Sequence, residues 1–299
     1  MCIRDRNKYV GDFIKTEVDN YLHKNPLVAE VMLQKIQDSE KERKAIAGVT
    51  KLARERAKKA NLHNRKLRDC RYHLSDGKGK DQETESCIFI TEGDSASGSI
   101  TKSRDVNTQA VFSLRGKPLN SYGLTKKVVY ENEEFNLLQA ALNIEDGIET
   151  LRYNKVIVAT DADVDGYQIR TLVLTMLYRL TPTLIEKGYV YIAESPLYEI
   201  TTKDRTYFAY TEPEKTAFLE EIGEKKYTIQ RSKGLGENDP EMMWLTTMNP
   251  ESRRLIKVQP ADVEETARVF DLLLGDNLAG RKEHIAEHGA EYLDDLDVS

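Results

Sequence analysis

Short apolar runs rich in β-forming residues recur through the middle of the chain, and helical periodicities separate them. The runs cover residues 87–91, 110–114, 155–160 and 189–193. A helix is expected over 131–142, and a second over 166–180, where Ile169, Leu172 and Val173 open an i, i+3, i+4 series that continues to Leu180. Strands that alternate with helices predict an α/β fold with a mostly parallel sheet and helices on both faces.

The two ends of the chain show different patterns. Residues 26–66 have high helix propensity and predict one long helix or two, starting from Asn25 as a capping residue and Pro26 at the first helical position. The polar segment 75–80 is the expected domain boundary. After Pro196, short strands are expected at 206–210 and 226–230, a loop at 233–236, and helices over 262–274 and on to 293. A long helical segment therefore precedes the sheet, and a mixed α+β region follows it.

Composition narrows the class of protein. Hydrophobic residues make up 39% and charged residues 31% of 299 residues, and no apolar run approaches the ~20 residues of a membrane helix. The start of the chain has no apolar segment typical of an export signal. Three scattered cysteines without a CxxC pair favour a reducing, cytoplasmic setting and exclude a disulfide framework.

The net charge of −6 conceals an asymmetry along the chain. Residues 51–80 carry 11 Lys and Arg against 3 Asp and Glu, whereas residues 261–299 carry 3 against 11. The basic end could therefore meet a polyanion such as DNA. The alternative is that these segments are only a solvated helix and an acidic tail.

The strongest chemical signal is the triplet Asp161, Asp163 and Asp165, directly after the predicted strand 155–160. Three carboxylates within five residues repel one another unless a cation offsets their charge, and oxygen ligands favour Mg²⁺ or Ca²⁺. A calcium EF-hand loop is excluded, because Leu172 stands where that loop needs a bidentate Glu. The alternative, in which the aspartates only cap the following helix, leaves at least one carboxylate unexplained.

Glu92 also follows a predicted strand, in the polar string from Glu92 to Ser99 that we interpret as a loop. Because parallel strands end at the same edge of a sheet, Glu92 and the three aspartates could share one metal site. A solitary Glu after a strand is usually just solvated, so the joint pattern carries the argument.

Several other chemistries lack their motifs. The chain has no P-loop, Gly234 and Gly236 lack the third glycine of a dinucleotide fingerprint, and Ser97 replaces the second glycine of a serine-hydrolase elbow. The five histidines contain no HExxH zinc motif.

The strings around these residues resemble a known family. A strand ending in Glu92-Gly-Asp-Ser-Ala and a later strand ending in Asp161-x-Asp-x-Asp-Gly resemble the TOPRIM metal site. Together with 114–120, 233–237 and 249–254, they resemble the B subunits of bacterial type IIA topoisomerases, from about residue 7 to 299. The strings 90–98 and 118–123 look more like one of the two branches of this family, and the other branch stays open.

The resemblance implies a domain organisation and partners. Residues 1–75 would be the end of a transducer domain with a connecting helix, 76–200 a TOPRIM domain, and 201–299 a region that completes the DNA gate. ATP would bind an ATPase domain that this chain lacks. A partner A subunit would supply the tyrosine that attacks double-stranded DNA, in an A2B2 heterotetramer, with Mg²⁺ as cofactor.

The resemblance also implies roles for individual residues. Glu92, Asp161 and Asp163 would be catalytic and would bind the metal, and Asp165 would bind it through water or support it. DNA contacts would come from Arg115, Lys117, Lys233, Arg253 and Arg254, and more weakly from the basic stretch 51–71. Without the resemblance, Arg115 and Lys117 would be interpreted as a solvated turn. The chain departs from the family at Gln168, where a His is usual, so proton transfer there is in doubt.

Two further function classes stay open. One is another TOPRIM enzyme, a primase or a nuclease, which would lack the strings 233–236 and 249–254. The other is a non-catalytic scaffold or binding module.

Overall fold

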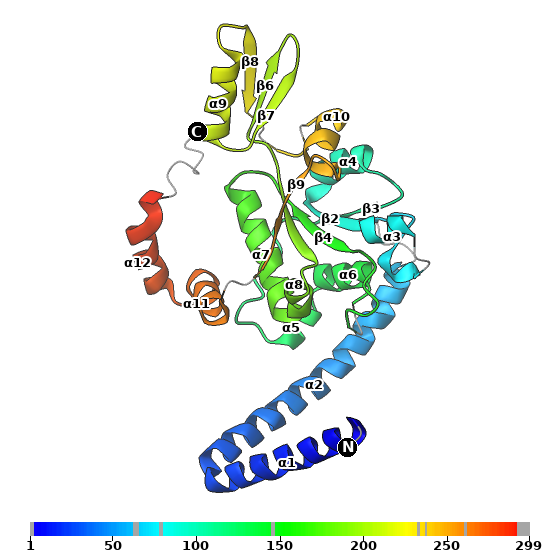
Figure 1. Ribbon diagram of the computed structural model, residues 1–299, viewed down its shortest axis with the longest axis vertical. Coiled ribbons are helices and arrows are strands. Elements are labelled where there is room, and N and C mark those ends of the chain that lie inside the picture. Colours follow the sequence, from blue (N-terminus) through cyan, green and yellow to red (C-terminus); the bar gives the residue numbers. More distant parts are fainter. Residues whose placement is uncertain are drawn as a thin grey trace. The chain divides into compact units, whose positions relative to one another are not determined.

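The computed structural model describes residues 3–61, 66–77, 80–144, 147–231, 234–236, 238–259 and 262–291 (Figure 1). The chain divides into two compact units, residues 1–52 and 53–299. None of the helices in the described ranges combines the length and apolar character that a membrane crossing requires.

The first unit is helical. It contains α1 (Ile3–Lys24) and the start of α2 (Pro26–Asn61). The predicted helix from Pro26 is confirmed, whereas α1 was not predicted, and residues 62–65 lie outside the described ranges. The Asn25 side chain donates a hydrogen bond to the Tyr21 carbonyl at 2.9 Å. Asn25 therefore satisfies the end of α1 with the side chain that we expected to cap α2.

A six-stranded sheet forms the centre of the second unit. Its order is β1-β3-β2-β4-β5-β9, with β3, β2, β4 and β5 parallel and the two edge strands antiparallel. The strands are β1 (Leu67–Arg68), β2 (Cys87–Glu92), β3 (Gln109–Leu114), β4 (Lys155–Ala159), β5 (Val190–Glu194) and β9 (Arg254–Lys257). The four predicted parallel strands are confirmed. β1 joins this sheet from upstream of residue 76, and the domain boundary itself stays a prediction.

Helices cover both faces of this sheet (Figure 1). Alternate strand residues such as Ile88 and Phe89 are fully buried in two separate apolar clusters, one on each face. The first cluster includes residues of α5 (Lys126–Tyr130), α6 (Glu133–Leu142), α7 (Val164–Leu180) and α8 (Pro182–Glu186). The second includes residues of α4 (Gly93–Ser103), α10 (Pro240–Met243) and the π-helical turn η2 (Trp244–Met248). The predicted α/β fold, with a mostly parallel sheet and helices on both faces, is thereby confirmed.

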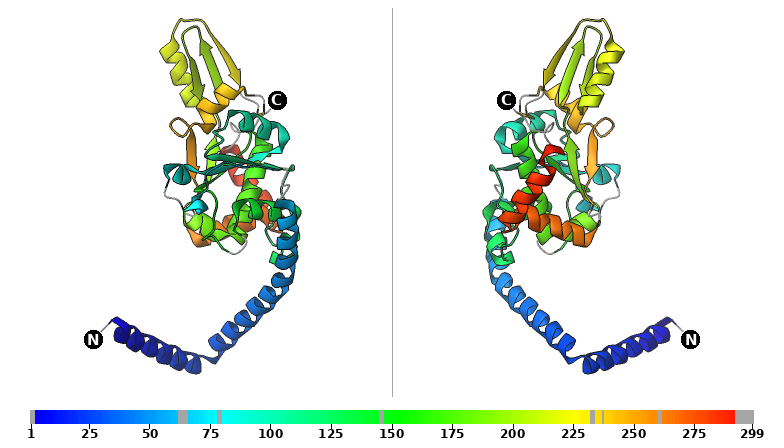
Figure 2. Two further views of the ribbon diagram at one scale, coloured as in Figure 1. Left: turned by 90° about the vertical axis from the view of Figure 1, so that its right-hand side faces the viewer. Right: turned by 90° about the vertical axis from the view of Figure 1, so that its left-hand side faces the viewer.

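A smaller sheet follows the central one. It has the antiparallel order β7-β6-β8, with β6 (Tyr198–Thr202), β7 (Thr206–Ala209) and β8 (Tyr227–Arg231), and α9 (Glu212–Ile222) packs on it. α11 (Val263–Leu274) and α12 (Leu278–His288) come last. The ring of Phe270 on α11 stacks on Tyr178 of α7 at 4.8 Å. The right-hand view of Figure 2 shows α11 (orange) and α12 (red) on the side of the second unit that faces the viewer. The α+β character expected for this region is thus present, together with five elements in its described residues that the sequence did not reveal: β6, α9, α10, η2 and β9.

One predicted loop is wrong. The string Glu92 to Ser99 is not a loop, because α4 begins at Gly93. Gly93 has a left-handed φ of 65°, which turns the chain directly from strand to helix. Ala96, Ser97 and Ile100 are then buried, so tertiary packing overrides the weak helix propensity of these small residues. Two short helical segments lie between β1 and β2: η1 (Leu74–Asp76) and α3 (Asp81–Glu85).

Candidate metal centre

The register of the central sheet brings Glu92 and the acidic triplet to one edge. β2 and β4 are parallel neighbours, with Thr91 opposite Ala159. Glu92 ends β2, and Asp161 follows the end of β4 by two residues. The shared edge that the sequence predicted is therefore present.

The turn that follows β4 fixes the second aspartate. The Asp163 side chain caps α7, because its Oδ1 accepts a hydrogen bond from the Gly166 N–H at 2.7 Å. A Cβ at position 166 would collide with the backbone of Asp161, so this turn requires glycine. Asp163 thus fulfils the capping role that we weighed as an alternative, but only through one of its two oxygens.

The loop 234–236 docks on the first aspartate. The Leu235 N–H donates to Asp161 Oδ1 at 2.7 Å, and a Cβ at Gly234 would lie 2.8 Å from Asp161 Oδ2. A Cβ at Gly236 would lie 2.5 Å from Ser95 Oγ on α4, and the Gly236 carbonyl accepts a hydrogen bond from Ser99 Oγ at 3.2 Å. The glycines therefore let this loop reach the acidic edge. Lys233 lies outside the described residues, and a DNA contact of this loop stays a prediction.

Glu92 is in an environment that disfavours its negative charge. Burial and the nearby charges of Asp161, Asp163 and Asp165 raise the pKa of Glu92, while Lys117 acts in the opposite direction. Its Oε2 is buried and has no hydrogen-bond partner within the described part of the chain. An unpartnered buried oxygen among like charges fits a cation, and carboxylate oxygens are ligands of the kind that Mg²⁺ prefers.

The carboxylates are spread more widely than the ligands of one ion. Within the described ranges, no three of them have oxygens that all lie within 4.8 Å of one another. Three of the four carboxylates bind separate partners: Asp161 accepts from Leu235, Asp163 from Gly166 and Asp165 from Lys117. The like charges of the carboxylates also repel one another. The residue types and their common edge therefore fit a divalent cation, and the assignment of individual ligands stays a prediction.

Two of the predicted DNA-binding residues lie on the turn after β3. Lys117 Nζ is 2.7 Å from Asp165 Oδ1. Arg115 is exposed, with its backbone N–H bound to Glu134. Arg115 also lines an open cavity of about 870 Å³, together with Lys66, Arg68 and Lys102. Basic side chains thus gather beside the acidic edge, where a polyanion would have to approach.

The other two predicted DNA-binding residues contact their own chain. Arg253 donates a hydrogen bond to the Met248 carbonyl at 3.3 Å and is partly buried. Arg254 pairs with Glu214 at 2.7 Å and lies over the ring of Tyr210. Both side chains already have partners, and a role in DNA binding stays a prediction for them. The side chains of residues 45–65, and with them most of the basic stretch, lie outside the described part of the chain.

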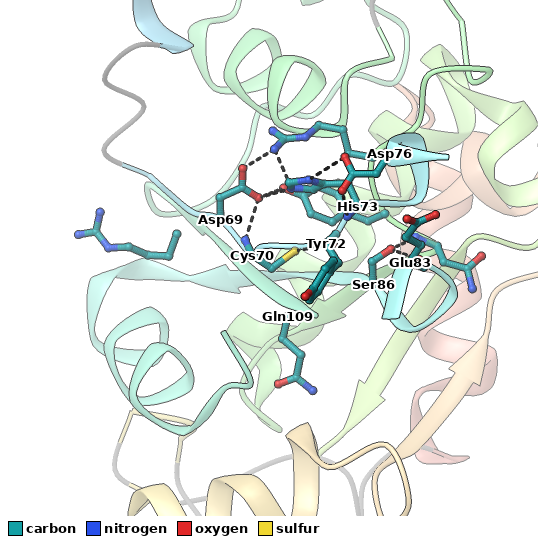
Figure 3. A network of polar contacts seen from close by, with 12 residues as sticks. Asp69, Cys70, Tyr72, His73, Asp76, Glu83, Ser86 and Gln109 are labelled. Atoms are coloured by element: carbon teal, nitrogen blue, oxygen red, sulfur yellow. Dashed lines mark hydrogen bonds and ion pairs between the residues drawn. The ribbon is translucent and has the colours of Figure 1, made fainter. Parts of the chain in front are cut away.

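A second group of possible metal donors was missed in the sequence, although the Asp-Cys-x-x-His spacing could have revealed it. Asp69, Cys70 and His73 have ligand atoms within 4.8 Å of one another (Figure 3). Arg152 pairs with Asp69 and lies 2.8 Å from His73 Nε2, and Tyr153 donates to Asp69 Oδ1 at 2.7 Å. The Arg152 guanidinium therefore already supplies a permanent positive charge next to these possible metal donors.

The charges in this second group favour a structural role. Burial alone would raise the pKa of Asp69, but hydrogen bonds from His73 and Tyr153 and the charge of Arg152 hold it well below its usual range. Burial also raises the pKa of the Cys70 thiol to about 12, so that it stays protonated and donates to the Tyr72 carbonyl. We interpret the group as a polar network that ties the segment after β1 to the segment before β4.

Comparisons with known proteins identify relatives of this chain. Residues 87–195 match the Toprim domain, and residues 224–286 match the carboxyl terminus of the DNA gyrase B subunit. The chain is 42% identical to the B subunit of DNA topoisomerase 4 from Borreliella burgdorferi over 281 residues, which is 93% of this chain and 46% of that protein. It is 38% identical to the DNA gyrase B subunits of Thermus thermophilus and Thermotoga maritima, over 97% and 95% of this chain and 45% and 44% of theirs. The chain thus spans less than half the length of these relatives.

Proposed function

The chain is a homologue of the B subunits of DNA gyrase and topoisomerase IV, and from that premise we propose that it is the part of an ATP-dependent type IIA topoisomerase that binds Mg²⁺ at the DNA gate. The observation that carries the proposal is Glu92, with a buried, unpartnered oxygen beside three aspartates at one sheet edge. The site would assist the reversible cleavage and religation of both DNA strands.

The proposed reaction is a transesterification. A tyrosine hydroxyl of the A subunit gives up its proton to water and attacks a DNA phosphodiester, a tyrosyl–phosphate bond forms, and the bond to the 3′ oxygen breaks. Glu92, Asp161 and Asp163 would hold Mg²⁺, with Asp165 as a ligand through water or as support. When bound, Mg²⁺ would offset the charge that develops on the scissile phosphate and the 3′ oxygen. Glu92 would give a proton to the 3′ oxygen on cleavage and take it back on religation.

DNA would approach over the basic side chains beside this edge. Arg115 is the best placed of the predicted residues, because it is exposed and shares a cavity with three further basic residues. Phosphate contacts of this kind position the duplex without reading its sequence, and they weaken as salt increases.

The partners follow from the relatives. We infer that an A subunit supplies the tyrosine in an A2B2 heterotetramer, and that ATP binds a part of the complete protein outside this chain. A cytoplasmic location fits the free, buried thiols of Cys70 and Cys87. The strings 90–98 and 118–123 favour topoisomerase IV, and the B subunit of gyrase is an alternative that the comparisons support equally. A fragment that binds DNA or a partner without activity of its own is the remaining alternative.

The test replaces Asp161 by Ala in the complete protein, reconstituted with its A subunit. Cleavage of supercoiled DNA, trapped by denaturant, should be lost at every Mg²⁺ concentration, because the site loses a central carboxylate. Asp204→Ala removes an exposed carboxylate that pairs with Lys225 at 3.7 Å, and should leave cleavage unchanged. Cleavage at the wild-type rate by Asp161→Ala would reject the metal assignment. DNA binding without cleavage by the wild-type complex would favour the binding module.

A further inference from the structure

The acidic edge contains a built-in positive charge. Lys117 extends from the turn after β3, where Gly116 adopts a left-handed φ of 72°, and its ammonium lies 2.7 Å from Asp165 Oδ1 on the first turn of α7. The two residues are 48 positions apart, so the pair joins two different elements across the edge.

Lys117 acts on more than one carboxylate. Its charge also stabilises the ionised form of Glu92, which the three aspartates oppose. The backbone N–H groups of Leu235 and Gly166 each donate a hydrogen bond, to Asp161 and Asp163 respectively. A backbone N–H carries no net charge, whereas the Lys117 ammonium brings a full unit of positive charge to Asp165.

We propose that Lys117 is a tethered counter-ion of the metal site. Without DNA its ammonium competes with a divalent cation for Asp165, and with DNA bound the ammonium pairs with a phosphate instead. This inference rests on the proposed function and concerns the regulation of the same site. DNA would thus raise the affinity of the site for the cation, and by reciprocity the cation would raise the affinity for DNA.

The exchange of partners is physically easy. The Lys117 and Asp165 side chains are 48% and 62% exposed, and ion pairs at such exposed positions contribute little to stability. A lysine ammonium sits on a flexible four-carbon stem and can turn to a phosphate without moving the backbone. The exposed Lys117 side chain can therefore pair with Asp165 in the free protein and with a DNA phosphate in the complex.

The experiment measures Mn²⁺ binding to the chain of residues 1–299 by electron paramagnetic resonance, with and without a short DNA duplex. Without DNA, Lys117→Met should bind Mn²⁺ roughly three- to tenfold more tightly, because the site loses a competing charge. With DNA, the increase in affinity seen for the wild type should be largely lost. Lys117→Arg keeps the charge and should behave like the wild type.

Two controls separate this inference from the proposed function. Lys127→Met removes an exposed lysine on α5 and should change Mn²⁺ affinity by less than about twofold. Asp161→Asn measures the Mn²⁺ binding that does not depend on the site, including any Mn²⁺ held by DNA itself. The difference between the wild type and this variant is the binding at the site. If the wild type binds Mn²⁺ through Asp161 but Lys117→Met binds it no more tightly, the counter-ion role is wrong and the metal site stands. If the wild type shows no binding that depends on Asp161, both proposals fail.

Discussion

At the residue scale, the carboxylate of Glu92 is placed where it can bind a cation, and this placement lowers the stability of the cation-free fold. Its carboxylate is partly buried and surrounded by three like charges, and these factors raise its pKa. Such a group is favourable only when its counter-charge is present. The electrostatic strain is therefore an expected property of the cation-free protein.

The substitution Glu92→Gln tests this strain. It should stabilise the protein in EDTA by about 1 kcal/mol at pH 8, because it removes the repelled charge while keeping the shape of the side chain. Added Mg²⁺ should raise the melting temperature of the wild type and leave that of the variant nearly unchanged. Thermal unfolding with and without Mg²⁺ measures both effects.

The pH dependence of this difference has a definite sign. The pKa of Glu92 is raised in the folded state, so the ionised group destabilises the fold above that pKa. The advantage of Glu92→Gln should grow as pH rises through the folded pKa and vanish below the unfolded value of about 4.3. An advantage that grows toward acid pH would contradict this account.

At the scale of elements, the sequence reveals those that bury a continuous apolar pattern. The strands at 87–92 and 155–159 were predictable because nearly every residue in them faces one of the two cores. β9 was not, since a short strand with Arg254 and Lys257 at its ends is recognisable only from its pairing with β5. The shared edge of Glu92 and Asp161 followed from strand direction alone, whereas the contact of Leu235 with Asp161 depends on a loop more than 70 residues away.

The Asp69 network is an element-scale feature with a testable stability. Asp69→Asn removes the charge that pairs with Arg152 and weakens the hydrogen bonds from His73 and Tyr153. We expect a loss of about 1–2 kcal/mol at pH 7, moderated by the partial exposure of Asp69. Urea unfolding measures it, and Asp204→Asn, at an exposed ion pair, should cost less than about 0.5 kcal/mol.

The contribution of the Asp69 network to folding stability should decrease at acid pH. Because the folded pKa of Asp69 is depressed, its contribution is complete above the unfolded value of about 3.9 and is lost as pH falls through the folded pKa. The deficit of Asp69→Asn should therefore shrink below about pH 4. A deficit that stays constant down to pH 2 would show that packing, rather than charge, is what the substitution disturbs.

At the scale of the whole molecule, the site and the core belong to one unit. Both apolar clusters of the central sheet and all four acidic residues lie within residues 53–299. A domain with its own core can fold alone. We therefore predict that a fragment of residues 53–299 unfolds in one cooperative transition and binds Mn²⁺ within about twofold of the full chain.

A shorter fragment provides the comparison. Residues 53–253 lack β9, which pairs with β5, and Phe270, which stacks on Tyr178 of α7. This fragment should lose stability, because an edge of the sheet and one side of α7 lose their cover. If residues 53–299 instead failed to unfold cooperatively, or bound Mn²⁺ tenfold more weakly, the metal site would depend on residues 1–52. The division into two units would then not be the functional one.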